Sequence, residues 1–307
     1  MESANPFTDR LLIEPKPQTT WRGPHAFWFT AMGIGGALFL NEVLFGIEMG
    51  RVLGLSLSHL LSLVLIGIGG MVLIADLGRP LRFLQAFRNV RHSWITWGAI
   101  CDFVFMTLDG LYILPTFTWV NGARPFAGLP TGPGTAVGGV FTVVAGIAAF
   151  VVIIYPGMVL AASRAIPFWN TTLIPLQFLA FAHASGLALV LLARPASVNG
   201  ALLLSAVLLV LLCLLAMGAH LLAARYGREA SRESLRVLLR GPLAGVFLLG
   251  TCLLGLIVPL ILGIVTLNGA GPDFAASAFI IMGVLSVAGN FFSKFSVIRA
   301  ARFAPLI

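Results

Sequence analysis

The sequence predicts an all-α integral membrane protein with eight transmembrane helices, and three observations predict it. Charged residues make up 10% of the 307 residues, whereas soluble domains carry roughly 25%. The mean hydropathy is +1.00. Apolar runs recur along the chain, each reaching the ~20 residues that a helix needs to cross the hydrocarbon. A chain so poor in charge cannot cover a water-exposed surface.

The expected spans divide the chain into one membrane domain, residues 27–298, between two tails. Residues 1–26 are polar and lack the pattern of a cleavable signal, so we expect a tail there. Residues 299–307 form the second tail. The eight predicted spans, in chain order, are 27–49, 55–76, 95–118, 136–160, 172–193, 199–224, 243–267 and 275–298.

The basic residues predict the orientation of these spans. An even number of spans places both termini on one side, and that side then holds 16 of the 19 basic residues. The other side holds Arg51, Arg124 and Arg194. Because Lys and Arg concentrate in cytoplasmic loops, we expect both termini in the cytoplasm. The same bias explains the basic pI without a nucleic-acid partner.

Two inner loops have an amphipathic pattern. In residues 225–242 the leucines Leu235, Leu238 and Leu239 share one face, which predicts a short surface helix. The segment "LRFLQAFRNV" between the second and third spans has the same character. The three cysteines are scattered through apolar runs without CxxC spacing, so we expect no metal site in this chain.

Five polar residues fall at similar depth towards the outer ends of the first three spans. An ionisable group in hydrocarbon costs on the order of 3 kcal/mol, so each requires a reason. Asn41 and Glu42 lie in the first predicted helix, which continues as far as residue 49 and therefore includes Glu48. His59 lies in the second helix, and the third carries Asp109 and Tyr112. We expect one pocket between these helices to collect the five residues Asn41, Glu42, His59, Asp109 and Tyr112.

This set of side chains suits a quinone. The head group of a quinone carries two carbonyls, which become hydroxyls on reduction, and it therefore needs hydrogen-bond donors and a group that exchanges protons. We expect Asn41, His59 and Tyr112 to hold the head group and Glu42 or Asp109 to exchange protons. Apolar walls would accept the isoprenoid tail. The structural alternative is that these groups only form hydrogen bonds between helices.

Two other functions compete for the same polar residues. A haem held by two histidines needs a pair at one depth, and no such pair is clear among His25, His59, His92, His183 and His220. A secondary transporter or a proton-translocating protein also carries acids inside the membrane. The residues that would offer inner steps for protons are Asp102, Asp109, His183 and Lys294.

Four motifs carry a resemblance to a known family. They are "DLGRPLRF" (76–83), "HSWITWG" (92–98), "SRAIPFWN" (163–170) and "ASGLALVLL" (184–192). In this order they resemble the NrfD/PsrC family, the membrane subunits of polysulfide-reductase-like complexes. The resemblance extends over the eight expected helices and most of the chain.

The resemblance implies a haem-free fold of two four-helix bundles that exchanges electrons with menaquinone or ubiquinone near the periplasmic face. The expected partner is a four-cluster ferredoxin-like iron–sulfur subunit, which in turn docks a molybdopterin or multihaem catalytic subunit. The chain would lie in the cytoplasmic (inner) membrane of a bacterium or archaeon and would not be catalytic alone. The family motifs do not include the quinone ligands, so the five site residues rest on depth and chemistry.

Overall fold

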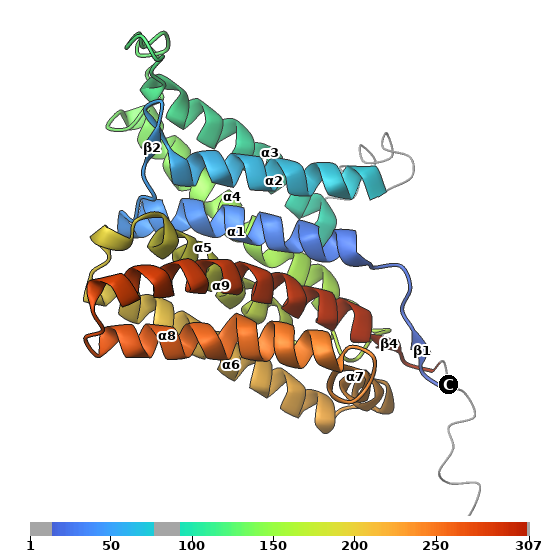
Figure 1. Ribbon diagram of the computed structural model, residues 1–307. Coiled ribbons are helices and arrows are strands. Elements are labelled where there is room, and N and C mark those ends of the chain that lie inside the picture. The colour runs from blue at the N-terminus through green and yellow to red at the C-terminus, as the bar shows by residue number, and fades with distance from the viewer. Residues whose placement is uncertain (1–13, 77–92, 306–307) are drawn as a thin grey trace, which may run out of the picture.

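The computed structural model describes residues 14–76 and 93–305 and is almost entirely helical (Figure 1). Eight helices in these residues are long and apolar enough to cross a membrane, which confirms the predicted number of spans. These are α1 (Gly23–Phe45), α2 (Leu57–Asp76), α3 with η2 (Trp94–Ile113 and Leu114–Thr116), α4 (Ala136–Ala161), α5 (Leu173–Ala193), α6 (Gly200–Arg225), η4 with α8 (Val246–Ile257 and Val258–Leu267) and α9 (Pro272–Ala300).

The remaining elements are short. A two-residue hairpin of β2 (Arg51–Val52) and β3 (Leu55–Ser56) joins α1 to α2, and η3 (Pro195–Ser197) precedes α6. The predicted surface helix after the sixth span is α7 (Glu229–Leu239), which buries Leu238 completely. The prediction for 225–242 is therefore confirmed. The similar segment between α2 and α3 lies outside the described residues.

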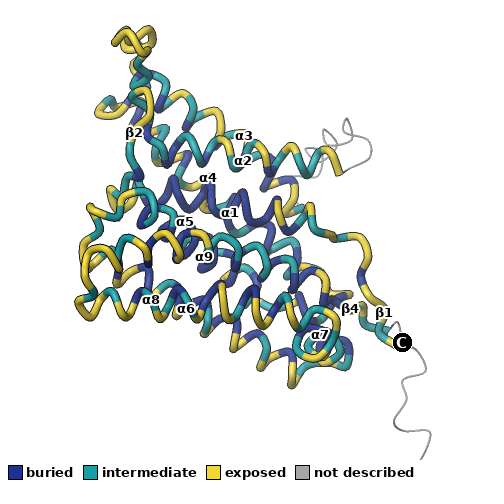
Figure 2. Tube along the Cα trace, viewed as in Figure 1, coloured by how far each residue is buried: buried dark blue, intermediate teal, exposed yellow. Residues whose placement is uncertain are grey.

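Helix α1 lies at the centre of the molecule. Its apolar side chains occur all around the helix, a pattern typical of a helix that packs on every side. It contacts α2, α4, α5 and α9, and 15 of its 23 residues are buried, against 5 of 20 in α2. Figure 2 shows the same contrast between the buried α1 and the more exposed outer helices. A side chain on α1 can therefore face α2 and α4 or face α5 and α9, depending on its position around the helix.

The two ends of the described chain lie together. Strand β1 (Lys16–Pro17) pairs antiparallel with β4 (Arg302–Phe303), so that Lys16 lies opposite Phe303. Next to this pair, Gln18 donates from Nε2 to the carbonyl oxygens of Trp21, at 2.8 Å, and Ile298, at 3.0 Å. An even number of spans brings the ends to one side of a bundle, and these hydrogen bonds hold them there.

The first helix ends earlier than predicted. Gly46 has φ 66°, a left-handed conformation that glycine adopts without steric cost, and its backbone N–H caps the helix by donating to the carbonyls of Asn41 and Glu42. The expectation that Glu48 lies in this helix is therefore wrong. Glu48 lies in the connecting segment and accepts a hydrogen bond from Arg51 at 2.7 Å.

The seventh span begins as a π-helix. Residues Val246–Ile257 have the wider turn, and the regular helix α8 follows with Pro259 in its first turn. Proline has no backbone N–H and its ring crowds the carbonyl four residues earlier, so a wide turn before it relieves that contact. The π-helix also crosses α9 where Gly255 meets Gly289: a Cβ built on Gly289 would lie 2.2 Å from the Cα of Gly255.

Candidate functional site

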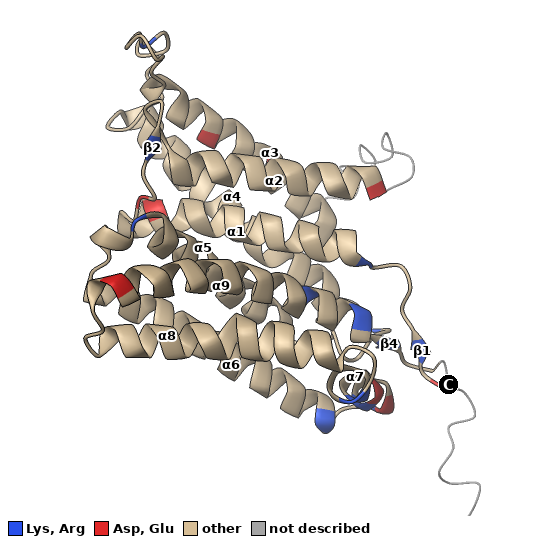
Figure 3. Cartoon of the chain, in the orientation of Figure 1, with Lys and Arg blue, Asp and Glu red and all other residues tan. Residues whose placement is uncertain are grey.

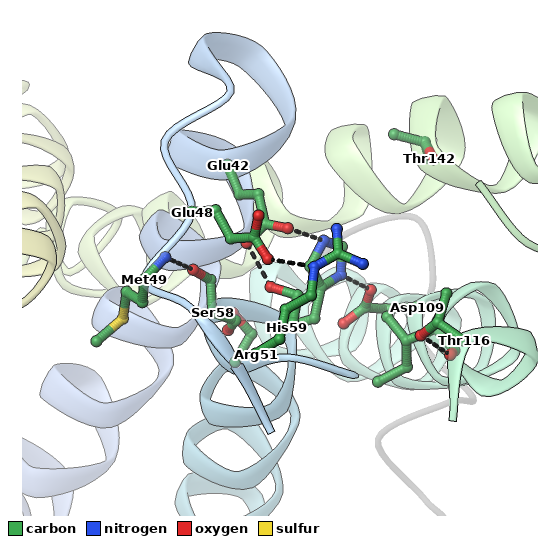
Figure 4. A network of polar contacts seen from close by, with 12 residues as sticks. Glu42, Glu48, Met49, Arg51, Ser58, His59, Asp109, Thr116 and Thr142 are labelled. Carbon is green, nitrogen blue, oxygen red and sulfur yellow. Dashed lines mark hydrogen bonds and ion pairs between the residues drawn. The ribbon is translucent and has the colours of Figure 1, made fainter. Parts of the chain in front are cut away.

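A chain of three titratable side chains joins the first three spans (Figure 4), towards the ends of these helices that lie away from the termini (Figure 1). His59 of α2 contacts Asp109 of α3 through Nδ1. Its other ring nitrogen, Nε2, lies 3.4 Å from Oε1 of Glu42 on α1. The side chains of His59 and Asp109 are 3% and 0% exposed, whereas that of Glu42 is 15% exposed. We call Glu42, His59 and Asp109 the carboxylate–histidine cluster.

Aromatic rings hold the imidazole in place. Tyr112 stacks on His59 with ring centroids 5.6 Å apart and an angle of 29° between the planes. Phe39 of α1 packs against His59 in a T-shaped arrangement, with ring centroids 5.1 Å apart. Tyr112 lies three residues beyond Asp109 on α3, so one face of that helix supplies both the carboxylate and the stacked ring.

The start of α2 is fixed by hydrogen bonds from serine residues. The Ser58 hydroxyl accepts from the backbone N–H of Met49 at 3.2 Å. One turn later, Ser62 donates to the carbonyl oxygen of Gly35 on α1 at 2.7 Å. These bonds fix the rotation of α2 against α1, and this rotation turns His59 towards Glu42.

The cluster can hold and pass a proton. Asp109 fixes the orientation of the imidazole through Nδ1. In many active sites a carboxylate orients a histidine base in this way. The second carboxyl oxygen of Asp109 is buried without a hydrogen-bond partner among the described residues. Glu42 is nearer the surface and accepts a hydrogen bond of 2.5 Å from Ser56. A proton on His59 therefore has a buried carboxylate on one side and a partly exposed one on the other.

Four of the five residues expected in one pocket come together, and Asn41 does not. Asn41 and Glu42 are consecutive residues of an α-helix, so their side chains point about 100° apart. The side chain of Glu42 points to α2, whereas the side-chain oxygen of Asn41, Oδ1, lies 3.0 Å from Nδ1 of His183 on α5. The expectation that Asn41 shares the pocket of His59 is wrong for this reason.

A second polar pair lies closer to the termini and consists of Asp102, which the sequence suggested for an inner proton step, and Tyr155, which the sequence did not suggest. Tyr155 of α4 donates to Asp102 of α3 at 3.3 Å, and the other Asp102 oxygen is buried without a partner among the described residues. The pair borders an apolar cavity of about 360 Å³ that includes Gly67 and Met71 of α2. The one hint in the sequence is a small residue, Gly98, one turn before Asp102. It lets the Tyr155 ring approach α3, because a Cβ at Gly98 would lie 2.3 Å from that ring.

A third polar group lies between α5 and α9. The buried Lys294 contacts the side-chain oxygen of Asn290, and its ammonium nitrogen lies 4.8 Å from the centre of the Phe178 ring. Asn290 donates to the hydroxyl of Ser185 at 3.1 Å, and Ser185 donates to the carbonyl of Ser286 at 3.0 Å. The group extends over two turns of α9.

The remaining described histidines have separate partners. His25 lies 3.5 Å from Asp76, and His220 lies 2.9 Å from the carbonyl oxygen of Phe168. Within residues 14–76 and 93–305, no group of three His, Cys, Asp or Glu side chains is arranged to hold a metal ion. His92 lies outside the described residues.

The chain matches the model of a known protein family. A family model described as "Polysulphide reductase, NrfD" matches residues 12–305, nearly the whole chain. The match includes the four motifs quoted from the sequence. No curated protein matches the chain.

Proposed function

Because the chain belongs to the NrfD family, we propose that it exchanges electrons between quinone in the membrane and a partner iron–sulfur subunit. NrfD proteins are membrane subunits of respiratory oxidoreductase complexes, in which they assemble with iron–sulfur and catalytic subunits. In this proposal the chain contributes the quinone site and the partners contribute the redox centres, so the isolated chain is inactive.

The carboxylate–histidine cluster is the observation that carries the proposal. The 3.4 Å between His59 Nε2 and Glu42 Oε1 is longer than a strong hydrogen bond between an imidazole and a carboxylate. The two atoms are too close for an oxygen to lie between them, but a quinol hydroxyl that approaches from one side can donate to Glu42 and accept from His59. Asp109 positions the imidazole, and the Tyr112 ring supports its face.

Glu42 provides the exit for protons. Oxidation of a quinol releases its hydroxyl protons, and a group that accepts them must also reach water. Glu42 is the most exposed member of the cluster and accepts from Ser56, which lies in the hairpin at the outer end of α2. Asp109 is too deeply buried for this role, so we assign proton exchange to Glu42 and positioning to Asp109.

The charge distribution supports a periplasmic quinone site. Figure 3 shows Lys and Arg gathered at the end of the molecule where β1 and β4 lie. Arg51, Arg124 and Arg194 are the described basic residues of the opposite end. We propose that the termini are cytoplasmic, that α1–α4 and α5–α9 form two four-helix bundles, and that the cluster lies near the periplasm.

The outer connection between α3 and α4 supports docking of a partner at that end. This loop, residues 117–135, forms turns and exposes several large apolar side chains. Those exposed are Trp119, Val120, Phe126 and Leu129. A set of apolar side chains on one loop is typical of an interaction surface, and we propose that the iron–sulfur subunit covers it.

The orientation has a direct test. Alkaline phosphatase is active only after export, so we expect an active fusion when it is inserted at Gly128 in the outer loop. A fusion after residue 305 is expected to be inactive, whereas green fluorescent protein at the same place fluoresces. The reverse pattern would contradict the cytoplasmic termini and place the cluster on the cytoplasmic side.

The quinone assignment is tested by quinol oxidation in the whole complex, measured as the part sensitive to a quinone-site inhibitor. Glu42→Gln removes a proton acceptor but keeps the shape and the hydrogen bond to Ser56, so we expect the rate to fall by about 100-fold. The matched control is Asp273→Asn at the outer start of α9, where an exposed carboxylate is neutralised away from the cluster. A normal rate in Glu42→Gln with a large loss in Asp102→Asn would move the head group to the inner cavity.

One observation favours a second function. Lys294 is buried with Asn290 and Ser185 but has no carboxylate partner among the described residues, and an ionisable side chain inside a membrane indicates an ion or proton path. The alternative is a transporter or proton-translocating protein. Proton flux through the purified chain in liposomes, lost in Lys294→Met, would support it. Co-purification with an iron–sulfur protein and no flux would support the quinone-reactive subunit.

A further inference from the structure

A cavity of about 870 Å³ lies on the other side of α1 from the carboxylate–histidine cluster. It is bordered by α1, α5 and α6, by the segment 46–48, and by Phe150 of α4. Its walls are mostly apolar, with Leu44, Leu179 and Leu187 among them. Phe150 of α4 and Leu208 of α6 border it and are themselves exposed on the surface that faces lipid. A molecule dissolved in the membrane can therefore enter between α4 and α6.

The deep end of this cavity carries an unused hydrogen-bond donor. Asn41 is 3% exposed, and its Nδ2 has no partner within the part of the chain that the structure describes. Its carbonyl lies 3.0 Å from Nδ1 of His183, and this contact fixes the amide plane. Both residues line the cavity. A buried donor without an acceptor is destabilising, so the amide favours a ligand that brings an acceptor.

We propose that this cavity binds the ring of a second isoprenoid quinone, with Asn41 Nδ2 donating to a ring carbonyl and His183 beside it. The identity of the ligand rests on the proposed function. A flat ring with a carbonyl at its edge satisfies the donor, and the apolar walls accept its methyl groups and tail. Asn41 and Glu42 are adjacent residues of α1, and their side chains point to different neighbouring helices. The body of α1 therefore lies between the two rings.

Other occupants fit less well. The acyl chain of a phospholipid fills the apolar walls but leaves the Asn41 amide unpaired. A phosphate group requires a positively charged partner. The Arg of the cavity lining, Arg194, lies at the mouth and already donates to the backbone carbonyl oxygen of Glu48 at 3.3 Å. The polar groups at the deep end are an amide and an imidazole, which suit a neutral carbonyl oxygen.

Photolabelling of the whole complex tests the site. A photoreactive azidoquinone is added in increasing amounts, and labelled peptides are identified by mass spectrometry. We expect two labelled regions: one at the cluster, in the peptides of His59 and Asp109, and one at the cavity, in the peptides of His183 and Ser205. Native quinone added in excess should suppress both.

Two pairs of variants separate the sites. Asn41→Leu keeps the volume and removes the donor, so half-saturation of the cavity label should need about fivefold more probe, the size of one neutral hydrogen bond. Its control is Ser205→Ala, because Ser205 already donates to the carbonyl of Ala201. Ser205→Phe fills the cavity from its exposed side and should abolish the label there. Leu204→Phe, exposed and outside the cavity lining, should not.

The regions that carry the label decide whether the cavity binds a quinone. A cavity label that needs about fivefold more probe in Asn41→Leu and is lost in Ser205→Phe, with the cluster label kept, supports this inference. Label at the cluster alone overturns it and leaves the proposed function intact. Label at the cavity alone supports it and contradicts the assignment of the cluster, and no specific label overturns both. A phospholipid found by native mass spectrometry and lost in Ser205→Phe, without quinone label, overturns it as well.

Discussion

Replacing His59 by alanine is expected to lower inhibitor-sensitive quinol oxidation by about 100-fold or more per assembled complex. His59 contacts both carboxylates of the cluster, and a positioned acid–base group contributes typically 10²–10⁴-fold to a rate. The variant also leaves Asp109 buried without its partner, which destabilises a protein by about 3–5 kcal/mol. The rate must therefore be divided by the amount of complex that assembles, measured from its iron–sulfur content.

His220→Ala is the matched control for this variant. His220 is also a buried histidine, hydrogen-bonded to the Phe168 carbonyl, but it lies on α6 away from the cluster. We expect lower stability and a nearly normal rate per complex. Equal rates in the two histidine variants would show that His59 supports only the structure. A normal rate in His59→Ala would contradict the assignment of the cluster.

Gly289→Val is expected to cause a large loss of stability by separating η4 from α9. The Cβ of any other residue at this position would lie 2.2 Å from the Cα of Gly255, so η4 and α9 cannot keep their separation. Small residues at such crossings let helix backbones touch, and close packing contributes much of helix association in membranes. Overpacking that forces the backbone to move typically costs about 1–3 kcal/mol.

The measurement is the midpoint of thermal aggregation of the purified complex in detergent. Gly218→Val is the control, because a Cβ at Gly218 meets no atom within 4 Å. We expect a clear fall of the midpoint in Gly289→Val and little change in Gly218→Val. Similar midpoints in the two variants would show that the contact between η4 and α9 does not limit stability.

The sequence predicted the spans well because the membrane imposes their length and composition. Apolar runs of about 20 residues have one stable form in hydrocarbon, a helix, so the ends of α4, α5 and α6 lie within one residue or so of the predicted ones. The end of α1 was less predictable. The segment "NEVLFGIE" is apolar enough for a helix to continue through it. The helix nevertheless stops before Gly46, because glycine adopts the left-handed conformation that caps a helix C-terminus.

The candidate site was only partly predictable, because depth follows from the sequence but helix rotation does not. Glu42, His59 and Asp109 were placed at one depth correctly, and the structure joins them. Asn41 lies at the same depth, yet it faces α5, because α1 is packed on all sides and either direction is open to a polar side chain. Rotation is decided by tertiary packing, which no pattern along α1 encodes.

Tyr155 was missed for a related reason. It lies in the middle of an apolar run, next to Pro156, and its partner Asp102 is on another helix. Depth suggested Asp102 for an inner proton step but gave no partner for it. Only the packing of α3 on α4, which Gly98 permits, brings the hydroxyl to the carboxylate.

Cryo-electron microscopy of the whole complex, reconstituted with quinone, would locate the bound ring. We expect a ring at the outer ends of α1, α2 and α3, with a ring oxygen within about 3.2 Å of His59 Nε2 or a Glu42 carboxyl oxygen. A ring bound only beside Asp102 and Tyr155, with the carboxylate–histidine cluster closed and its contacts unchanged, would contradict this expectation.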